Sequence, residues 1–132
     1  MKPLYLIACS AAKLDHAAPA ADLYTGQAFK LAMAAAERAG ADVVILSALH
    51  GAVNPTQQLQ PYNRALADMN TQQRKVWAGM VAQQLQQHHG RQITVLAGKH
   101  YAAAVNTFPN VSRPLASLGI GQQLAALKSL TN

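Results

Sequence analysis

Short apolar runs alternate along this chain with longer stretches in which apolar residues recur at helical spacing. Three runs, Leu4 to Ala8, Val43 to Leu46 and Ile93 to Ala97, are rich in Val, Ile and Leu. Runs of this length, separated by helix-like segments, are typical of buried strands in a parallel sheet. Such strands are joined by right-handed crossovers. The pattern therefore predicts a small three-layer α/β domain, with a three- to four-stranded, mostly parallel sheet flanked by helices.

The stretches between the runs predict the helices and one further strand. We expect a helix capped by Asp22 or Thr25 and ended by Gly40, and a second helix from a cap at Asn70 to His88. The apolar positions of the second helix, where we expect burial, are Val76, Trp77, Met80, Val81 and Leu85. The other expected elements are a loop at 49–63, helical segments at 64–69 and 99–106, a last helix carrying Leu124, Leu127 and Leu130, and a fourth strand at Val111 or Leu115.

Size and composition predict one domain, residues 1–132. A chain of 132 residues is long enough to bury roughly two thirds of its unfolded surface. Cys9 is the only cysteine, so an internal disulfide is impossible, which fits a reducing compartment. The apolar stretch that follows Met1 is too short for a signal peptide or a membrane span. We therefore expect a cytoplasmic protein that does not enter a membrane, and the sequence gives no indication of its oligomeric state.

The chain is basic because acids are scarce rather than because bases are abundant. Lys and Arg number 11 against 5 Asp and Glu, which gives a formal charge of +6, yet only 12% of the residues are charged. A positive field raises the local concentration of phosphate-bearing partners. The one local cluster, Arg74 and Lys75, has no interleaved aromatic residues that could stack on bases. This pair fits a solvated helix face better than a dedicated nucleic-acid patch.

Each apolar run ends in residues that can take part in chemistry. In an open parallel sheet, ligands bind beyond the carboxyl ends of the strands, where loops diverge and helix amino termini point inward. We therefore expect the polar residues after the three runs to converge on one rim. The three segments are Cys9 and Ser10 with Lys13 just beyond, Ser47 to Gly51, and Gly98 to Tyr101.

The first segment has a Ser-x-x-Lys spacing, from Ser10 to Lys13. A lysine amine at this spacing can help to remove the serine proton, or can itself attack a carbonyl or sugar carbon. The alternative is a helix-capping serine beside a surface lysine. Cys9 has two interpretations as well, as a packed and inert thiol or as a nucleophile.

The second segment contains His50, whose imidazole can exchange a proton near neutral pH. The alternative is a histidine that satisfies loop carbonyls. The histidines show no metal-binding spacing, so we predict neither a metal nor a cofactor, although a shared site for His50 and His100 stays open. Because acids are scarce, we do not expect two-carboxylate hydrolysis or a multi-carboxylate magnesium site. Tyr24 to Gly26 offers amides, a hydroxyl and a phenol to an anion or a planar ring.

Four segments in the same order resemble the YaaA peroxide-stress family. The family's I-S-P-A-K-T-L-D, Y-T-G, L-S-G-L-Y-G-x-L-x-P and Q-P-Y are similar, in turn, to Cys9 to Asp15, Tyr24 to Gly26, Leu46 to Pro55 and Gln60 to Tyr62. A weaker similarity joins the family's third strand and following tyrosine to Ile93 through Tyr101. The resemblance implies an α/β protein with a positively charged cleft, associated with DNA binding and protection during oxidative stress.

A more distant resemblance is to the domain of archaeosine synthase in which a cysteine-serine-x-x-lysine segment modifies a deazaguanine base. It implies that Lys13 is a nucleophile toward a nucleobase substituent. The chain also departs from the YaaA pattern. The connection from Pro19 to Tyr24 is short where the family carries a helical insertion thought to help hold duplex DNA, and His50 replaces a tyrosine of the family.

We therefore expect a YaaA-like enzyme that accepts a nucleobase, nucleoside or nucleotide, free or in nucleic acid, and carries out a transfer or cleavage on it. Lys13 would be the nucleophile or base, Ser10 would orient it and His50 would exchange the proton. The alternatives are a non-catalytic nucleic-acid-binding protein of the oxidative stress response, or a structural protein whose alanine-rich helices contact a partner.

The other expected residues would bind the substrate. Ser47 and Thr25 would donate hydrogen bonds to it. Tyr24 or Tyr62 would stack on its ring. The remaining members of the expected binding site are Cys9, Gly26, Gly51, Pro61, Lys99 and His100.

Overall fold

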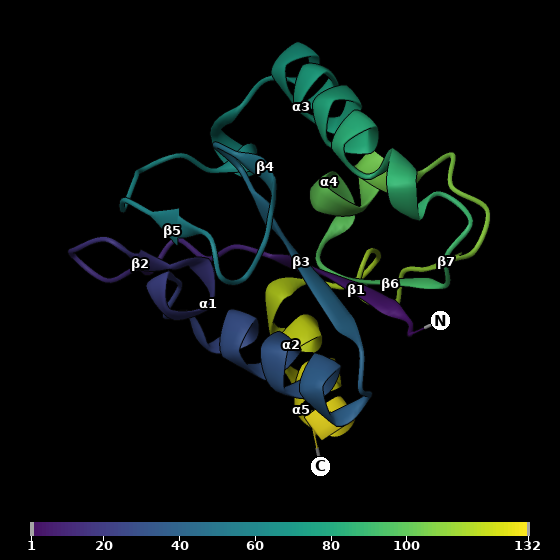
Figure 1. The fold of residues 1–132 in the computed structure, drawn as a ribbon, viewed down its shortest axis with the longest axis horizontal. Helices are drawn as coiled ribbons and strands as arrows, with labels where there is room; N and C mark the ends of the chain where they lie inside the picture. Colours follow the sequence, from purple (N-terminus) through teal and green to yellow (C-terminus); the bar gives the residue numbers. More distant parts are fainter. Residues whose placement is uncertain (1, 132) are drawn as a thin grey trace.

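The computed structural model describes residues 2–131. A five-stranded sheet forms the centre of the fold, between the helices (Figure 1). The strands lie in the order β4-β3-β1-β6-β7. β3, β1, β6 and β7 are parallel neighbours, and β4 is antiparallel to β3. The strands are β1 (Leu4–Ala8), β3 (Asp42–Ser47), β4 (Gly51–Val53), β6 (Ile93–Leu96) and β7 (Val111–Ser112).

This sheet confirms the predicted α/β class and its mostly parallel strands. The additional strand at Val111 is confirmed as β7. The edge strand β4 lies where we expected only loop, because the chain turns back sharply at Gly51, whose φ of 75° favours glycine. Two further short strands, β2 (Ala18–Pro19) and β5 (Gln58–Leu59), pair antiparallel beside the main sheet.

Helices cover both faces of the sheet and complete three layers (Figure 1). α2 (Gln27–Arg38) and α5 (Ile120–Thr131) pack together on one face, and α3 (Thr71–Gln84) and α4 (Lys99–Ala102) lie on the other. Within residues 2–131, no helix is both long enough and apolar enough to cross a membrane. The shorter elements are α1 (Ala20–Leu23) and the 3-10 turns Leu66–Asp68, Gln86–His88 and Ala103–Val105.

The core consists of two apolar clusters, one on each face of the sheet. Along β1, Leu6 belongs to the cluster under α3, and Ile7 belongs to the cluster under α2 and α5. Successive side chains of a strand point to opposite faces, so a strand covered by helices on both sides needs apolar residues at every position. This explains why the runs that predicted the strands are continuous rather than alternating.

α3 buries a narrower stripe than we expected. Trp77, Val81 and Leu85 are buried, whereas Val76 is 64% exposed and Met80 is 39% exposed. Residues four apart share one helix face, and a neighbour one position away is rotated by about 100°. Expecting burial at Val76 and Met80 was therefore wrong. The predicted cap is confirmed, because the Asn70 side chain accepts from the Gln73 amide within a capping box.

α2 begins later than the predicted caps. Its N-cap is Gly26, which provides no side-chain hydrogen bond, so neither Asp22 nor Thr25 caps it. The predicted end is confirmed, since Gly40 follows the helix with a φ of 65°. Small side chains, Ala32 and Ala36 among them, are buried along the helix. They allow α2 to lie close to the sheet and to α5.

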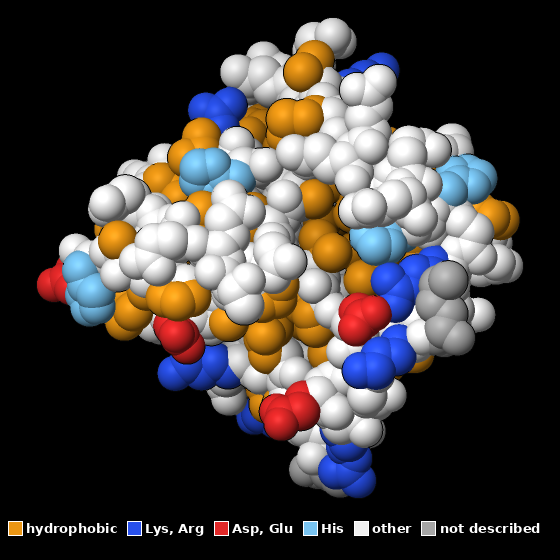
Figure 2. Space-filling model, in the orientation of Figure 1, with side chains coloured by type: hydrophobic (Ala, Val, Ile, Leu, Met, Phe, Trp, Pro, Cys, Tyr) orange, Lys and Arg blue, Asp and Glu red, His pale blue; other side chains and the backbone are white. Residues whose placement is uncertain are grey.

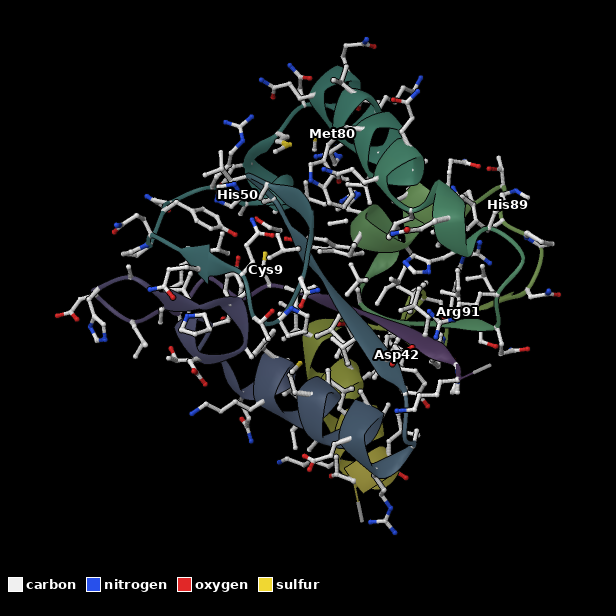
Figure 3. All side chains as sticks on the ribbon, viewed as in Figure 1. Cys9, Asp42, His50, Met80, His89 and Arg91 are labelled. Carbon is white, nitrogen blue, oxygen red and sulfur yellow. The ribbon has the colours of Figure 1, made fainter. Side chains whose placement is uncertain are left out.

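An ion pair closes the amino end of the sheet, far from the residues that end the strands. Arg91 donates to the Asp42 carboxylate and to the Lys2 carbonyl. Figure 3 shows Asp42 and Arg91 at the end of the sheet opposite Cys9 and His50. Hydrogen bonding to Arg91 lowers the pKa of Asp42. The ion pair between Arg91 and Asp42 therefore lies at the amino end of the sheet, and the candidate site lies at the carboxyl end.

Candidate functional site

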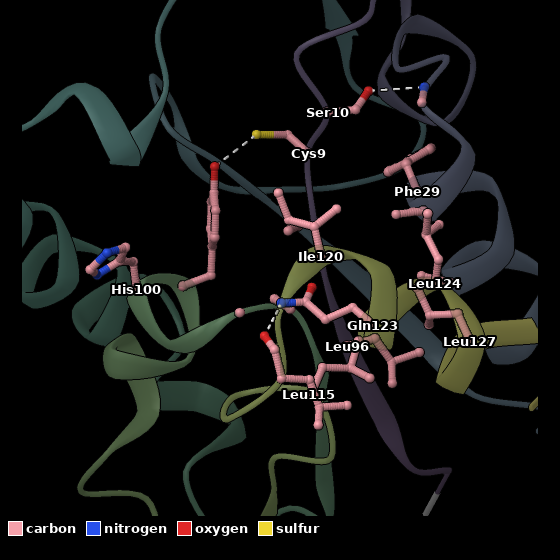
Figure 4. A pocket seen from close by; sticks show the side chains of 18 of the residues that line it. Cys9, Ser10, Phe29, Leu96, His100, Leu115, Ile120, Gln123, Leu124 and Leu127 are labelled. Atoms are coloured by element: carbon pink, nitrogen blue, oxygen red, sulfur yellow. Dashed lines mark hydrogen bonds between the residues drawn. The ribbon is translucent and has the colours of Figure 1, made fainter.

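A cleft of about 890 Å³ opens at the carboxyl ends of β1 and β6 (Figure 4). This is the end at which a parallel sheet presents diverging loops. Five parts of the chain surround the cleft: the loop after β1, the start of α2, the 3-10 turn Leu66–Asp68, the segment from the end of β6 into α4, and the segment that leads into and along α5. The lining residues are 8–12, 26–29, 32, 66–67, 96–101, 115–120, 123, 124 and 127.

The walls of the cleft differ in character. One wall is apolar, and Figure 4 shows Phe29, Leu124 and Leu127 together on it. The rest of the lining carries groups that can donate, accept or react, among them Cys9, Ser10, Lys99, His100, Tyr101 and Gln123. A mainly apolar hollow with a few polar groups is typical of sites for small organic molecules.

Ser10 joins the loop after β1 to the start of α2. Its Oγ donates to the Ala12 carbonyl at 2.6 Å and accepts from the Gly26 amide at 3.2 Å. A Cβ at Gly26 would lie 2.7 Å from the Ser10 Cβ, so only glycine allows this close approach. Ser10 therefore fixes the loop to α2, and no hydrogen bond between Ser10 and Lys13 is present in residues 2–131.

Cys9 meets Tyr101 across the cleft. The Cys9 Sγ and the Tyr101 hydroxyl are 3.5 Å apart, and the edge of the Tyr101 ring packs against Trp77 with ring centroids 5.5 Å apart. Burial, followed by the charge of a Cys9 thiolate, raises the pKa of Tyr101. Tyr101 therefore keeps its proton at neutral pH and presents a phenol beside the thiol.

α4 places two basic residues at the edge of the cleft. Lys99 and His100 form its first turn, directly after β6. Burial, together with the positive charges of Arg74 and Lys99, lowers the pKa of His100. At neutral pH the imidazole is therefore uncharged, and Lys99 supplies the positive charge on this side.

A second polar group, which we call the hydroxyl cluster, consists of Lys13, Tyr24, Ser47, His50 and Tyr62. Its centre is the Tyr62 hydroxyl, which lies 2.6 Å from the Ser47 Oγ and 2.6 Å from the Tyr24 hydroxyl. Ser47 is fully buried and Tyr24 is 1% exposed. The cluster joins the end of β3 to the loops that follow β1 and β5.

Counting protons assigns a direction to these hydrogen bonds. The Ser47 Oγ accepts from the amides of Leu49 and His50, at 3.2 and 3.0 Å. With both lone pairs engaged, it donates its proton to Tyr62, and Tyr62 donates in turn to Tyr24. Burial raises the pKa of Tyr24 and of Tyr62, and in Tyr62 the charge of a Cys9 thiolate adds to this effect. The cluster is thus a protonated network in which each hydroxyl has at least one partner within the protein.

Lys13 and His50 lie against the same aromatic ring. The Lys13 Nζ is 4.4 Å from the centroid of the Tyr62 ring, a cation–π distance. The His50 ring meets Tyr62 edge-on, with centroids 5.5 Å apart. The amine and the imidazole that we expected at a common rim therefore share Tyr62 as a neighbour.

The structure divides the expected site residues into two groups. Cys9, Ser10, Gly26, Lys99 and His100 line the cleft. The other expected residues are outside the lining of the cleft. For three of them, the structure explains why they are not available to a ligand. The Ser47 hydroxyl is saturated by protein groups, the Tyr24 ring is too buried to stack on a ligand, and Gly51 is buried where a Cβ would meet α3. The remaining ones are Lys13, Thr25, His50, Pro61 and Tyr62.

Sequence reasoning missed Gln123 and most of the apolar wall. Tyr101 is the last residue of the third segment, but it was not among the residues expected to bind the substrate. Gln123 carried no signal, because it lies in the last helix and reaches the strand ends only after α5 folds back onto α2. The cleft therefore contains residues from both ends of the chain.

Most of the positive charge is dispersed or engaged. Figure 2 shows Lys and Arg side chains spread along the outline of one face rather than gathered in a patch. Arg74 donates to the carbonyls of Leu66 and Met69, so half of the pair considered for nucleic-acid binding holds the fold instead. The other arginines that donate to backbone carbonyls are Arg38, Arg91 and Arg113.

Metal-ligating side chains are dispersed as well. Within residues 2–131, no three histidine, cysteine, aspartate or glutamate side chains gather closely enough to hold a metal ion. The described geometry therefore points to organic functional groups: a thiol, phenols, an amine, imidazoles and a carboxamide.

Comparison with known proteins identifies a family for this chain, but the function of that family is unknown. The chain matches no curated protein and no solved structure. One family model, described as a family of unknown function (DUF6884), matches residues 4–129. This match covers both the cleft and the hydroxyl cluster. The chain belongs to the family DUF6884.

Proposed function

We propose that this protein is an enzyme that binds a nucleobase, nucleoside or nucleotide in the cleft and carries out a transfer or cleavage reaction on it. The observation that carries the proposal is the cleft itself, an open hollow at the carboxyl ends of parallel strands with one apolar wall and several polar groups. Its volume of about 890 Å³ lies within the usual range for small-molecule sites.

The apolar wall and the polar part of the lining match the base and the sugar-phosphate of a nucleotide, respectively. A flat base would pack on the apolar wall around Phe29 and Leu124, where contact with water is lost on binding. The sugar or phosphate would lie toward Lys99 and the first amides of α2, which no side chain caps. A positive side chain and a helix amino terminus both favour an anion.

The chemical step is assigned to the hydroxyl cluster next to Cys9. Lys13 is proposed as nucleophile or base, and His50 as the group that exchanges the proton. Cys9 lines the cleft, and Cys9 and Tyr62 pack against the apolar core cluster that contains Tyr24, which supports a link between the cleft and the hydroxyl cluster. The likeness to the YaaA family, and with it a role in oxidative stress, is part of the same proposal.

Ligand binding is the first test. The wild-type protein is heated with each nucleoside and each nucleoside monophosphate, and the unfolding midpoint Tm is recorded. A ligand that binds only the folded state raises Tm as its concentration rises. If no nucleoside or nucleotide raises Tm at millimolar concentration, the proposal is wrong.

Catalysis is the second test. Each ligand that binds is incubated with the protein, and released base is measured by chromatography while intact-protein mass spectrometry detects a covalent adduct. Lys13→Ala is expected to abolish both signals and to leave Tm almost unchanged. Lys30→Ala, an exposed lysine on α2, is the control and should retain them. Binding without product or adduct in the wild type would reduce the proposal to a binding protein.

The charge of +6 favours one other function, non-catalytic binding of nucleic acid. Affinity for a nucleic acid would then fall steeply with salt and would depend on Lys75 and Lys99. Cys9, Ser10 and His50 would be dispensable. Fluorescence anisotropy with a single-stranded and a duplex oligonucleotide, at low and at physiological salt, distinguishes this function from the enzyme.

A further inference from the structure

Gln123 is a polar side chain in the cleft to which the proposed function gives no role. It projects from the first turn of α5, and Figure 4 shows its amide between the apolar wall and the side of His100. Its Nε2 donates to the Leu118 carbonyl at 2.9 Å. A Cβ added at Gly98 would lie 3.4 Å from this nitrogen, so the amide lies directly beyond the end of β6.

The bond to Leu118 fixes which way the amide faces. A flipped amide would turn its oxygen toward the Leu118 carbonyl, and two acceptors repel each other. Within residues 2–131, Oε1 accepts no hydrogen bond, and the only side-chain nitrogen or oxygen that is buried without a partner is Arg113 Nε. Oε1 is therefore accessible, and one N–H of Nε2 remains free beside it.

We propose that Gln123 determines specificity in the cleft by pairing with the edge of a bound ring that carries a hydrogen-bond donor next to an acceptor. This inference rests on the proposed function. A primary amide presents one donor and one acceptor side by side, and nucleobase edges offer the complementary pair. Because the amide cannot flip, its pairing partner must present the donor toward Oε1 and the acceptor toward Nε2.

The surroundings of Gln123 strengthen this role. Ile120, Leu124 and Leu127 flank it on α5 and line the same wall. A single polar group in an apolar wall is left without a partner if the wrong ring displaces water from it, and that loss makes the site selective. The apolar wall would provide affinity for any flat ring, and Gln123 would favour rings whose edge carries the matching hydrogen-bond donor and acceptor.

The experiment compares matched ligands by isothermal titration. Adenosine and cytidine are compared with their N6,N6-dimethyl and N4,N4-dimethyl counterparts, and guanosine and uridine with 1-methylguanosine and 3-methyluridine, so that the donor N–H beside the acceptor of the base edge is lost in each. The wild-type protein is expected to bind at least one parent nucleoside about 5- to 100-fold more tightly than its methylated counterpart. In Gln123→Met, which keeps the size of the side chain, the ratio should fall close to one.

One control variant and the wild-type measurements separate the possible failures. Gln122→Met removes a neighbouring glutamine whose Oε1 accepts from the Gly119 amide at 3.1 Å, and it should keep the wild-type preference. If no parent nucleoside binds the wild type, the proposed function has failed. If parents bind and are not preferred over their counterparts, or if Gln123→Met keeps the preference, the role of Gln123 is wrong. If Gln123→Met does not fold, a wild-type protein that shows no preference still refutes the role of Gln123, and Gln123→Leu replaces the variant for the positive test.

Discussion

The cleft and the hydroxyl cluster differ in how far their polar groups already form hydrogen bonds within the protein. In the hydroxyl cluster, Ser47 and Tyr24 are buried and their hydroxyls bond within the protein. In the cleft, the Lys99 amine and the Gln123 carbonyl form no hydrogen bond with the described part of the protein, so a ligand can bond to both. Buried polar groups that are fully satisfied hold a structure in one arrangement. Polar groups left open in a hollow are available to a ligand.

The Ser-x-x-Lys segment is divided between these two regions. Ser10 bonds to Ala12 and Gly26 at the wall of the cleft, and Lys13 lies over the Tyr62 ring. The backbone at Lys13 forms a β-bridge with Tyr24 rather than continuing a helix. The two side chains therefore serve different surroundings, and the comparison teaches that sequence spacing alone does not make them a catalytic pair.

The largest effect on stability is expected from Ser47→Ala. This change removes the acceptor of the Leu49 and His50 amides and one of the two partners of the Tyr62 hydroxyl, at a cost of about 1–3 kcal/mol. Ser10→Ala, in the cleft, removes two hydrogen bonds at a partly exposed position, where water can replace them, and should cost less than Ser47→Ala. Urea unfolding followed by Trp77 fluorescence measures both. Equal losses in the two variants would break the distinction between a closed cluster and an open cleft.

Tyr62→Phe is expected to have a smaller effect and separates the hydroxyl from the ring. The change removes two hydrogen bonds of the cluster, at a cost of about 1 kcal/mol, while Lys13 keeps an aromatic face beneath it. Tyr62→Leu should lose both. If Lys13 acts chemically from its place on this ring, product formation should survive Tyr62→Phe and fall in Tyr62→Leu. Identical activities in the two variants would count against that placement.

Ile120→Ala should affect the cleft and not the fold. Ile120 is 81% exposed at the mouth of the cleft, so stability should change by less than about 0.5 kcal/mol. Affinity for a bound nucleoside is expected to fall about three- to tenfold, because apolar contact is lost. Val76→Ala is the matched control, since Val76 is 64% exposed on α3 and outside the cleft. A fall in affinity in both variants would contradict the assignment of the site.

The smallest effect is expected at the amino end of the sheet, as a control for both regions. The lowered pKa of Asp42 means that its carboxylate contributes stability above the unfolded pKa of about 3.8, and this contribution is lost as pH falls through the folded pKa. Asp42→Asn should therefore lower Tm slightly at pH 7, and the difference from the wild type should shrink as pH falls below about 3.8. Ligand binding should be unchanged, and a change in affinity would show that the two ends of the sheet are coupled.

The sequence by itself determined the class of fold and the edge of the sheet at which the cleft opens. Continuous apolar runs specify strands buried on both faces, and parallel strands place their carboxyl ends at one edge. This reasoning is sufficient to bring Cys9, Ser10, Gly26, Lys99 and His100 to the same edge of the sheet. Each of them stands at a strand end or at the start of the following helix, where local pattern and position in the fold coincide.

Only the tertiary structure decided which side chains are free and which are already paired. Ser47 and Tyr24 looked suited to bind a ligand, but their hydroxyls meet Tyr62, which follows Tyr24 by 38 residues. Gln123 carried no signal until α5 packed on α2 and brought it beyond β6. Hydrogen-bond satisfaction depends on contacts between distant segments, and no local pattern of residues encodes these contacts.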